Sequence, residues 1–398
     1  MRNWRRKVTA ASDNYMNVMR MTPRERINTA MKLQHPDRVP LMCQFSIGFI
    51  NQQLKGSGIS PMQVWLDPYK YAEGLMILRD RFKFDGILVS LHGQDENWRS
   101  TTQHLERING IEVATFNNRK ESYPDDDLPY AEFFHTRIHD INELRIQDIS
   151  DQITYIPASK DCYAYIDQAN PYLVFDIIDE QIRGSCAIHG EVTSPFDYLL
   201  DMFGYENALI ALLSDPDKCK KILQRFTDGL LRLIDGMCRK NIDAVKISSP
   251  FVGMGFISPG QYLEFEQPYI RQLTDAISKH KKYSYIHTCG LINDRLEFMR
   301  DTRPNGLECL DPPPIGNVEL QDAFDRIGKE LFIKGNIDPV NTLFKGSKDV
   351  VKMDVAARLK TGMKNPGFIL SSACSIAPKT PAENVLLLSS FIEKYGYY

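Results

Sequence analysis

The sequence predicts an α/β protein, a TIM-type (β/α)8 barrel. Eight short runs rich in β-branched and apolar residues recur along the 398 residues, and most are separated by longer stretches with helical periodicity. A doubly wound open sheet is the competing layout, but no Gly-x-Gly-x-x-Gly segment follows the first expected strand. Length alone suggests two or three domains, yet α/β barrels often exceed that size as one domain. We therefore expect a single barrel.

The composition is that of an ordinary globular chain and excludes several function classes. Hydrophobic residues make up 43%, charged residues 25%, and the formal net charge is −3. This balance gives no argument for a nucleic acid or an anionic membrane surface as partner. No apolar run reaches the roughly 18 residues of a membrane span. The eight cysteines are scattered singly, which favours a reducing compartment over a disulfide framework, so we expect a cytoplasmic protein.

The barrel is expected to follow a basic N-terminal stretch and one helix. No apolar segment follows the basic start, so we expect residues 1–21 to be a flexible segment and 22–398 to form the barrel. Thr22 can cap the first helix, Pro23 suits its first position, and Glu25 completes a capping box. The barrel strands are expected at about 39–45, 85–91, 183–189, 243–249, 283–288, 305–310, 331–336 and 367–372. Helical periodicity marks 66–82, 196–213, 217–239, 261–280, 317–330 and 380–394.

One segment interrupts this alternation. Residues 92–160 contain short alternating runs, such as 111–116, and an acidic turn at 123–129. We expect a small β-rich insertion there, between the second and third barrel strands. It can serve as a lid, as a partner surface, or only as decoration.

The strongest chemical signal is a set of three potential metal ligands, His287, Cys289 and Cys374. The first two end the fifth expected strand, where side chains two residues apart point to the same side, and Cys374 follows the eighth. Active sites of such barrels lie at the carboxyl ends of the strands. One imidazole and two thiolates fill three positions of a tetrahedral zinc site and leave the fourth for a substrate. A lone His-x-Cys is a weak signal, because free cysteine is usually a small buried hydrophobe.

Further candidates end neighbouring strands. Cys309 is the rival metal ligand, although a buried core residue is the favoured interpretation. Asp338 can act catalytically as a partner of the metal ligands or as a fourth ligand, or it can cap the helix that follows it. His92 and His189 are expected at the ends of the second and third strands, facing the same mouth, as acid–base candidates. Asp85 precedes the second strand, where a cap is favoured over a catalytic role.

The loop after the fourth strand is a candidate for ligand binding. Ser248 ends this strand, and Gly253 and Gly255 follow it. Because glycine has no side chain, the two glycines can let a bulky ligand approach the backbone. A plain loop explains them nearly as well.

A set of motifs resembles the uroporphyrinogen decarboxylase superfamily, over about residues 22–398. The motifs are Pro36-Asp37-Arg38-Val39-Pro40, Ile257-Ser258-Pro259, His287-x-Cys289-Gly290, Gly335-Asn336-Ile337-Asp338-Pro339, and Cys374 near Pro378. Within the superfamily, the sequence is most similar to the corrinoid-dependent branch of methylcobamide methyltransferases and O-demethylase methyltransferases. That resemblance implies a barrel with zinc held by a His-x-Cys pair and a distant cysteine, here His287, Cys289 and Cys374.

The resemblance implies a zinc-dependent methyltransferase that moves a methyl group between a small methylated substrate and the cobalt of a corrinoid (cobalamin). A His-Cys-Cys set favours a thiol substrate, whereas the insertion at 92–160 favours a methoxylated compound, to which we lean. No Asp-x-His-x-x-Gly stretch of a cobalamin-binding module is present, so the corrinoid is expected on a partner protein that docks at the barrel mouth. In this setting His92 and His189 are also candidates for corrinoid contact. The oligomeric state is open, with a homodimer as one option.

Two alternatives remain. The first is decarboxylation of a tetrapyrrole, for which the decarboxylases use an arginine-rich stretch after the first strand. Residues 42–49 contain no basic residue, so a polyanionic substrate would keep unpaired carboxylates there. The second is a non-catalytic barrel that only binds a partner.

Overall fold

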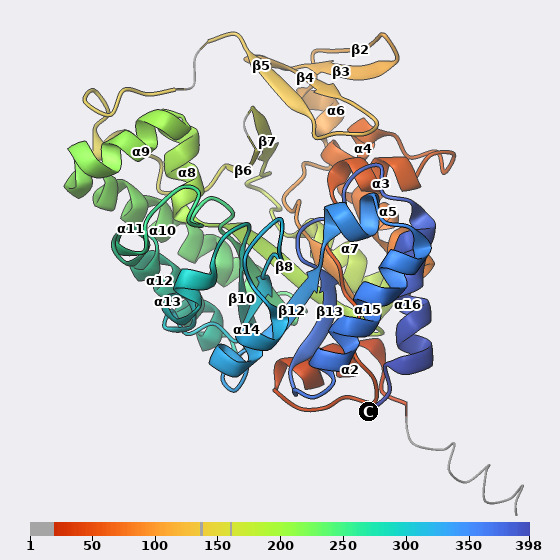
Figure 1. The fold of residues 1–398 in the computed structure, drawn as a ribbon. Coiled ribbons are helices and arrows are strands. Elements are labelled where there is room, and N and C mark those ends of the chain that lie inside the picture. The colour runs from red at the N-terminus through yellow and green to blue at the C-terminus, as the bar shows by residue number, and fades with distance from the viewer. Residues whose placement is uncertain (1–19, 136–137, 160) are drawn as a thin grey trace, which may run out of the picture.

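The computed structural model describes residues 20–135, 138–159 and 161–398, so the prediction for residues 1–21 falls almost wholly outside the described part. A parallel sheet of seven strands curls through the centre, with helices around it (Figure 1). Its order is β1 (Gly86–Val89), β8 (Ala187–Thr193), β9 (Ala244–Ser248), β10 (Tyr283–Thr288), β11 (Gly306–Cys309), β12 (Phe332–Ile337) and β13 (Phe368–Ser372). These strands are almost entirely buried, as expected for a parallel sheet covered on both faces.

The segment at 39–45 occupies the remaining barrel position, between β13 and β1. Leu370 donates its N–H to Pro40 O at 2.9 Å, and Asp85 donates its N–H to Leu41 O at 2.8 Å. The segment forms isolated bridges and no regular strand, which corrects the expectation of a first strand at 39–45. Pro40 has no N–H to give, and the N–H of Leu41 is taken by the Asp85 carboxylate at 2.8 Å. The predicted TIM-type barrel is confirmed, with an irregular first position.

Helices surround this sheet and connect its strands. They are α2 (Pro23–Met31), α3 (Ile47–Gln53), α4 (Pro61–Leu66), α5 (Pro68–Phe82), α7 (Leu173–Ile182), α8 (Pro195–Phe203), α9 (Tyr205–Ser214), α10 (Pro216–Cys238), α11 (Pro259–Phe265), α12 (Gln267–Lys279), α13 (Leu296–Arg300), α14 (Leu320–Ile327), α15 (Lys348–Gly362) and α16 (Ala382–Tyr395). Short turns of helix are α6 (Trp98–Thr101), η1 (Ile146–Asp148), η2 (Asn293–Arg295) and η3 (Pro339–Phe344). The capping box of Thr22 and Glu25 at the start of α2 is present.

The third barrel strand lies four residues later than expected, at Ala187–Thr193 instead of 183–189. The helix α7 ends at Ile182, and Arg183 and Gly184 both have positive φ, at 47° and 74°. Residues 183–186 therefore form the turn that ends the helix, and the strand begins after them.

The predicted β-rich insertion is confirmed between β1 and β8. It contains an antiparallel sheet of β2 (His104–Ile108), β3 (Ile111–Thr115), β4 (Arg119–Tyr123) and β5 (Tyr130–Phe133), and a hairpin of β6 (Tyr155–Ser159) and β7 (Cys162–Tyr165). In Figure 1 the four-stranded sheet stands over α3, α4 and α6. Lys379 pairs with Asp126 at 2.8 Å, which ties the acidic turn of the insertion to the segment after Cys374.

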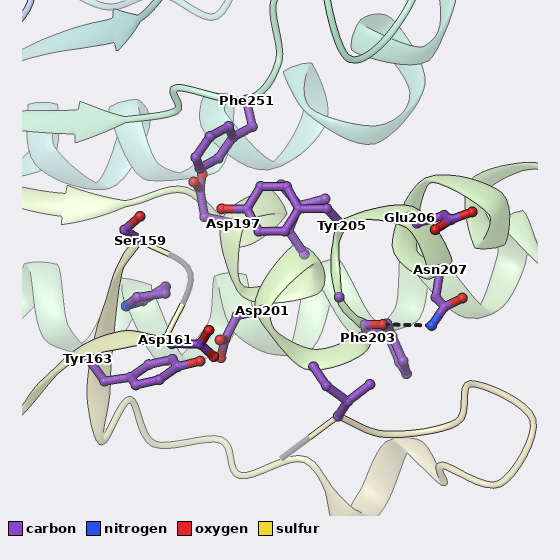
Figure 2. Close-up of a pocket in the computed structure, with 14 residues that line it drawn as sticks. Ser159, Asp161, Tyr163, Asp197, Asp201, Phe203, Tyr205, Glu206, Asn207 and Phe251 are labelled. Carbon is purple, nitrogen blue, oxygen red and sulfur yellow. Dashed lines mark hydrogen bonds between the residues drawn. The ribbon is translucent and has the colours of Figure 1, made fainter. Parts of the chain in front are cut away.

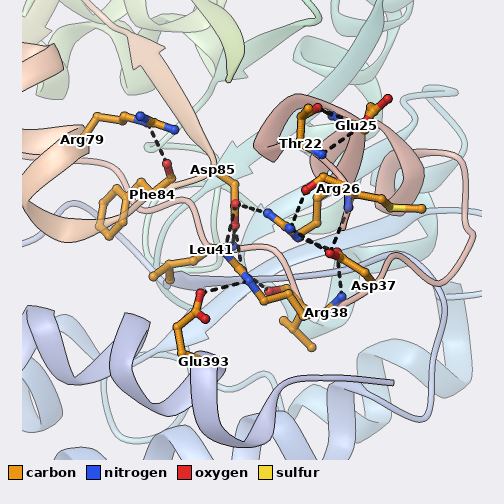
Figure 3. A network of polar contacts seen from close by, with 12 residues as sticks. Thr22, Glu25, Arg26, Asp37, Arg38, Leu41, Arg79, Phe84, Asp85 and Glu393 are labelled. Carbon is orange, nitrogen blue, oxygen red and sulfur yellow. Dashed lines mark hydrogen bonds and ion pairs between the residues drawn. The ribbon is translucent and has the colours of Figure 1, made fainter. Parts of the chain in front are cut away.

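A buried polar network joins both ends of the chain at the start of β1 (Figure 3). Asp85 is 1% exposed and accepts from Arg26 Nη1 at 2.6 Å and Arg38 Nη1 at 3.0 Å. Arg26 also binds Asp37, and Arg38 pairs with Glu393 of α16 at 3.3 Å. The carboxylate of Asp85 thus holds α2, the first barrel segment and the start of β1 together, a structural role rather than a catalytic one.

Among the described residues, none of the helices combines the length and the apolarity that a membrane-spanning segment requires.

Candidate functional site

His287, Cys289 and Cys374 lie together at the carboxyl ends of β10 and β13. His287 Nε2 is 3.2 Å from Cys289 Sγ, the two sulfurs are 3.5 Å apart, and Cys374 Sγ is 3.9 Å from Nε2. Zinc bonds of about 2.0–2.3 Å in a tetrahedral site imply donor–donor distances of roughly 3.6–3.8 Å. The three side chains therefore fit three corners of a zinc tetrahedron. We call them the His-Cys-Cys triad.

A carboxylate from the neighbouring strand orients the imidazole of His287. His287 is 3% exposed, and its Nδ1 donates to Glu308 Oε2 at 3.0 Å, which leaves Nε2 facing the thiols. Glu308 also pairs with Lys334 and, at 3.4 Å, with Lys246. Burial alone would raise the pKa of Glu308, but the two ammonium groups hold this pKa well below its usual value. A histidine that ligates zinc usually has such a partner on its other nitrogen.

Sequence reasoning missed these three charged residues, although a signal was present. Each is a charged residue inside an otherwise apolar strand, in Ala-Val-Lys246-Ile, Gly-Leu-Glu308-Cys and Phe-Ile-Lys334-Gly. Charged side chains are almost never fully buried unless they are paired. Lys246 extends the network to Glu191 of β8 at 2.9 Å and to Gln44.

The thiols of the site differ in acidity. Hydrogen bonds from Cys309 and Cys374 lower the pKa of Cys289 well below its usual value, against the effect of burial. Cys289 is therefore the thiol that ionises first, and a thiolate is the form that binds a metal.

The end of β11 adds two further donors. Cys289, Cys309 and Asp311 also have donor atoms within 4.8 Å of one another. Cys309 is fully buried, as expected, but its thiol lies next to the triad. Asp311 Oδ2 accepts from Gly290 N at 2.7 Å, whereas its buried Oδ1 has no partner among the described residues. Both residues therefore lie close to Cys289 of the triad.

Asp338 takes the alternative role that the sequence left open, that of a helix cap. Its Oδ1 accepts from Val340 N and Asn341 N, each at 2.8 Å, and its Oδ2 accepts from Asn341 Nδ2 at 2.8 Å. Both oxygens are thus occupied at the start of η3. The donor atoms that gather around Cys289 do not include this carboxylate.

The two candidate histidines are buried, and burial lowers the pKa of each to about 4, so both are neutral at pH 7. His92 follows β1, and neither of its ring nitrogens has a partner among the described residues. His189 does not end its strand, which corrects the expectation. It is the third residue of β8, beside Ala244 at the start of β9, and its Nδ1 is hydrogen-bonded to Tyr285 Oη at 3.1 Å. His189 therefore lies in the barrel interior and not at the mouth.

The loop after β9 packs against the triad. Ser248 is the register partner of His287, and the next residue, Ser249, donates its N–H to His287 O at 2.8 Å. A Cβ added at Gly253 would lie 3.0 Å from Cys289 O, whereas one at Gly255 would meet nothing within 4 Å. A side chain at position 253 would therefore require the backbone next to the triad to shift by a few tenths of an ångström.

A cavity of about 440 Å³ lies between the hairpin β6–β7, the helices α8 and α9, and Phe251 after β9 (Figure 2). Figure 2 shows Asp197 close to the rings of Phe251 and Tyr205. Burial raises the pKa of Asp197, whose Oδ2 accepts from Ser194 Oγ at 3.0 Å. No triad residue lines this cavity. We place the chemistry at the triad, because donor atoms converge there.

Comparisons with known proteins agree with this fold. The family model for uroporphyrinogen decarboxylase (URO-D) matches residues 123–395. The methylcobamide:CoM methyltransferase MtbA of Methanosarcina acetivorans is 22% identical over 381 residues, which cover 94% of this chain and 99% of the relative. The methylcobamide:CoM methyltransferase MtaA of Methanosarcina barkeri is 23% identical over 219 residues, 55% of this chain and 61% of the relative. The chain thus matches less than two thirds of that relative.

A decarboxylase and a solved structure complete the comparison. The chloroplastic uroporphyrinogen decarboxylase 2 of Oryza sativa subsp. japonica is 26% identical over 225 residues, 54% of this chain and 55% of the relative. A methyltransferase from Methanosarcina mazei has the same fold, with a TM-score of 0.70 and 18% identity over 94% of this chain and 99% of that one. Because the family model matches more than half of the residues, the chain belongs to the uroporphyrinogen decarboxylase family.

Proposed function

We propose that this protein is a zinc-dependent methyltransferase. It moves a methyl group from a small methoxylated compound to the cobalt of a corrinoid that a separate protein carries. The observation that carries the proposal is the His-Cys-Cys triad, whose donor distances of 3.2–3.9 Å suit a tetrahedral zinc ion. The relatives that match nearly the whole chain bear the name methylcobamide:CoM methyltransferase.

The donor set suits a zinc ion with an open position. His287, Cys289 and Cys374 would hold it, and the ion would supply Lewis acidity toward a substrate oxygen or sulfur. Glu308 keeps the imidazole of His287 in the tautomer that presents Nε2. Lys334 and Lys246 keep this carboxylate ionised, so that it remains a hydrogen-bond acceptor. Asp311 and Cys309 border the site on the β11 side.

The insertion also helps to form a cavity. Its hairpin β6–β7 encloses the cavity of about 440 Å³ against α8 and α9. The walls of the cavity include Tyr205 and Phe251, which suit an aromatic body. Because no triad residue lines this cavity, it does not decide between a methoxylated aromatic compound and a small thiol at the triad. At 440 Å³ the cavity is of the size that small-molecule sites have, about 300–1,000 Å³. We further expect the protein to act in the cytoplasm, where the metal-binding cysteines stay reduced.

The decarboxylase alternative is disfavoured by the same site. Two thiols and an oriented imidazole have no role in a decarboxylation that uses no metal. A non-catalytic barrel would have no reason to hold His287 through a buried carboxylate and two lysines.

The first experiment is to measure the zinc content of the purified protein beside Cys289→Ala and Cys374→Ala. The matched control is Cys162→Ala, a buried cysteine of the insertion. We expect about one zinc per chain in the wild type and the control, and its loss in both triad variants. Methyl transfer to cob(I)alamin from a panel of methoxylated aromatics should fall in the same variants. A wild-type protein that cannot take up zinc would rule out the proposal.

A further inference from the structure

The barrel interior carries a polar layer below its mouth, and Glu191 of β8 belongs to it. Glu191 lies two positions beyond His189, whose side chain is inside the barrel. Because alternate side chains of a strand point to the same face, Glu191 also points inward, one step nearer the carboxyl end of the strand. Its register partner on β9 is Lys246, and the two side chains pair at 2.9 Å. Neither residue belongs to the His-Cys-Cys triad.

Lys246 holds two side chains in place at this level of the barrel. Its ammonium pairs with Glu191 Oε1 and donates to Oε1 of Gln44, a residue of the first barrel segment. The side chain of Lys246 is fully buried. Burial alone would lower the pKa of Lys246, but Glu191 and Glu308 raise this pKa above its usual value, so the ammonium stays charged. One oxygen of the Glu191 carboxylate and the amide oxygen of Gln44 are therefore fixed by the protein.

The other polar atom of each held side chain is available to a ligand. Glu191 Oε2 and Gln44 Nε2 make no hydrogen bond to a residue that the structure describes. Both side chains are accessible, because that of Glu191 is 10% exposed and Gln44 is half-buried. Toward the amino ends of the strands the interior is filled by a buried apolar cluster that includes Met42, Ala187 and Ala244. A ligand therefore reaches the two atoms from the mouth.

The same lysine connects these two atoms to the triad. Lys246 Nζ is 3.4 Å from Glu308 Oε2, and this oxygen accepts from His287 Nδ1 at 3.0 Å. The two thiols of the triad are partly exposed, so the triad is also open to a ligand. A compound bound at the triad therefore has the two available atoms as neighbours across Lys246.

One of the two atoms is an acceptor and the other is a donor, and a hydroxyl group satisfies both. A hydroxyl donates through its O–H and accepts through its lone pairs. A carboxylate on the ligand would be repelled by the charge of Glu191 and could not donate to it. An ammonium on the ligand could not accept from Gln44. The pair therefore selects a neutral hydroxyl.

We propose that Glu191 and Gln44 are specificity-determining residues of the methyl-transfer site and bind a hydroxyl group of the substrate. Glu191 Oε2 accepts from this hydroxyl, and Gln44 Nε2 donates to its oxygen. The preferred methyl donor is then a methoxylated compound that also carries a free hydroxyl. This inference rests on the proposed function, which supplies the methoxylated substrate. A site that binds a hydroxyl rejects the analogue without one, because its own polar groups are then left unpaired.

Isothermal titration calorimetry of the full-length protein, without any corrinoid, tests the proposal. The probes are the isomers of methoxyphenol, each beside the methoxytoluene in which a methyl group replaces the hydroxyl, and beside the methoxybenzoate as the anionic analogue. We expect at least one methoxyphenol to bind about tenfold more tightly than both of its analogues, a difference of about 1.4 kcal/mol. Equal affinities for all isomers, or no binding of any methoxyphenol, overturn the proposal.

Two variants with matched controls locate the effect. Gln44→Met removes the donor with little change in size, and Glu191→Gln removes the available acceptor. We expect each variant to weaken binding of the preferred methoxyphenol about tenfold and to leave binding of the methoxytoluene unchanged. The controls Gln321→Met and Glu264→Gln change exposed residues of α14 and α11 and should keep the wild-type preference. A preference that survives in both Gln44→Met and Glu191→Gln overturns the proposal.

The design also allows for poor folding and for failure of the proposed function. In Glu191→Gln, Lys246 keeps Glu308 as its anion at 3.4 Å, so we expect this variant to fold. If it does not, Gln44→Met decides, because that change removes no charge. A preference for the methoxyphenol without any methyl transfer to cob(I)alamin would support this hydroxyl site and refute the methyltransferase. Methyl transfer with no preference for the hydroxyl would refute the hydroxyl site alone.

Discussion

At the scale of single residues, the geometry of the triad depends on groups that lie outside it. Glu308 connects His287 to two buried lysines, Lys334 and Lys246. The sequence predicted the triad, because the His-x-Cys pair and the distant cysteine each follow an expected strand and can be recognised by residue type and spacing. It did not predict Glu308, since Lys334 is 26 residues away and only the register of β11 and β12 brings the two together.

We predict that Glu308→Gln lowers both stability and zinc affinity. The change leaves Lys334 buried without its anion, whereas Lys246 keeps Glu191, and the loss costs about 3–5 kcal/mol. It also weakens the orientation of His287, which lowers zinc affinity about 10–100-fold. Urea unfolding and competition with a zinc chelator measure the two effects. The double variant Glu308→Gln, Lys334→Met should recover stability but not zinc affinity, and recovery of both would contradict this role.

The two glycines after β9 provide a matched pair of variants. At Gly253 an added Cβ meets Cys289 O at 3.0 Å, so Gly253→Ala should displace the Cys289 loop, cost about 1–3 kcal/mol and weaken zinc binding. At Gly255 there is free space, so Gly255→Ala should change neither. Melting temperature and zinc content of the two variants test this difference. Equal values for Gly253→Ala and Gly255→Ala would show that the close contact at Gly253 does not matter.

At the scale of elements, the sequence predicted the strands better than the helix boundaries. The fifth strand was placed at 283–288, as observed, because buried parallel strands are continuous apolar runs. The expected helix at 196–213 is two helices, since Gly204 has φ of 75°. The helix at 261–280 is likewise divided, at Glu266, because Pro268 stands in the first turn of α12 and cannot continue α11. Hydrophobic periodicity alone does not register such single-residue breaks.

The buried Glu266 gives the protein a predicted pH dependence. Burial raises its pKa to about 8, against hydrogen bonds from Ser249 and Ser194. Between about pH 4.5, near the unfolded value, and pH 8 the folded state holds a proton that the unfolded state releases. Stability contributed by this group is therefore full at low pH and falls as the pH rises through that window, by on the order of a few kcal/mol.

Melting temperatures at pH 6 and pH 9 test this dependence. Glu266→Gln should be less sensitive to the rise in pH than the wild type, because its side chain cannot ionise. The control Glu264→Gln, which changes a glutamate paired with Lys220 on the surface, should keep the wild-type dependence. A Glu266→Gln curve parallel to that of the wild type would refute the assignment.

At the scale of the whole molecule, the barrel, its number of positions and the place of the insertion were predictable, because they follow from the repeated alternation of strands and helices. The way in which the barrel closes at its first position was not predictable. It depends on Asp85, which binds Arg26 and Arg38 from other segments of the chain. The sequence suggested that Asp85 caps the start of the strand. In the structure its carboxylate instead accepts the N–H of Leu41, which a strand neighbour would otherwise bind.

We predict that Asp85→Asn destabilises the fold by about 3–5 kcal/mol, because two buried arginines lose the carboxylate that they share and keep only Asp37 and Glu393. The zinc content of the variant that remains folded should stay at the wild-type level, since the network lies at the opposite end of the strands from the triad. Urea unfolding and metal analysis measure the two quantities. Loss of zinc without loss of stability would assign Asp85 to the metal site instead.

The pairing of Pro40 and Leu41 with Leu370 also bears on how the chain is made. During synthesis the first barrel segment leaves the ribosome more than 300 residues before its partner exists, and the edge of this segment that faces Leu370 stays unpaired for the same time. Exposed strand edges of nascent chains aggregate readily. When β13 is made, it pairs with this edge and closes the barrel. A chain whose translation stops before β13 therefore keeps an open sheet edge that chaperones and proteases can recognise.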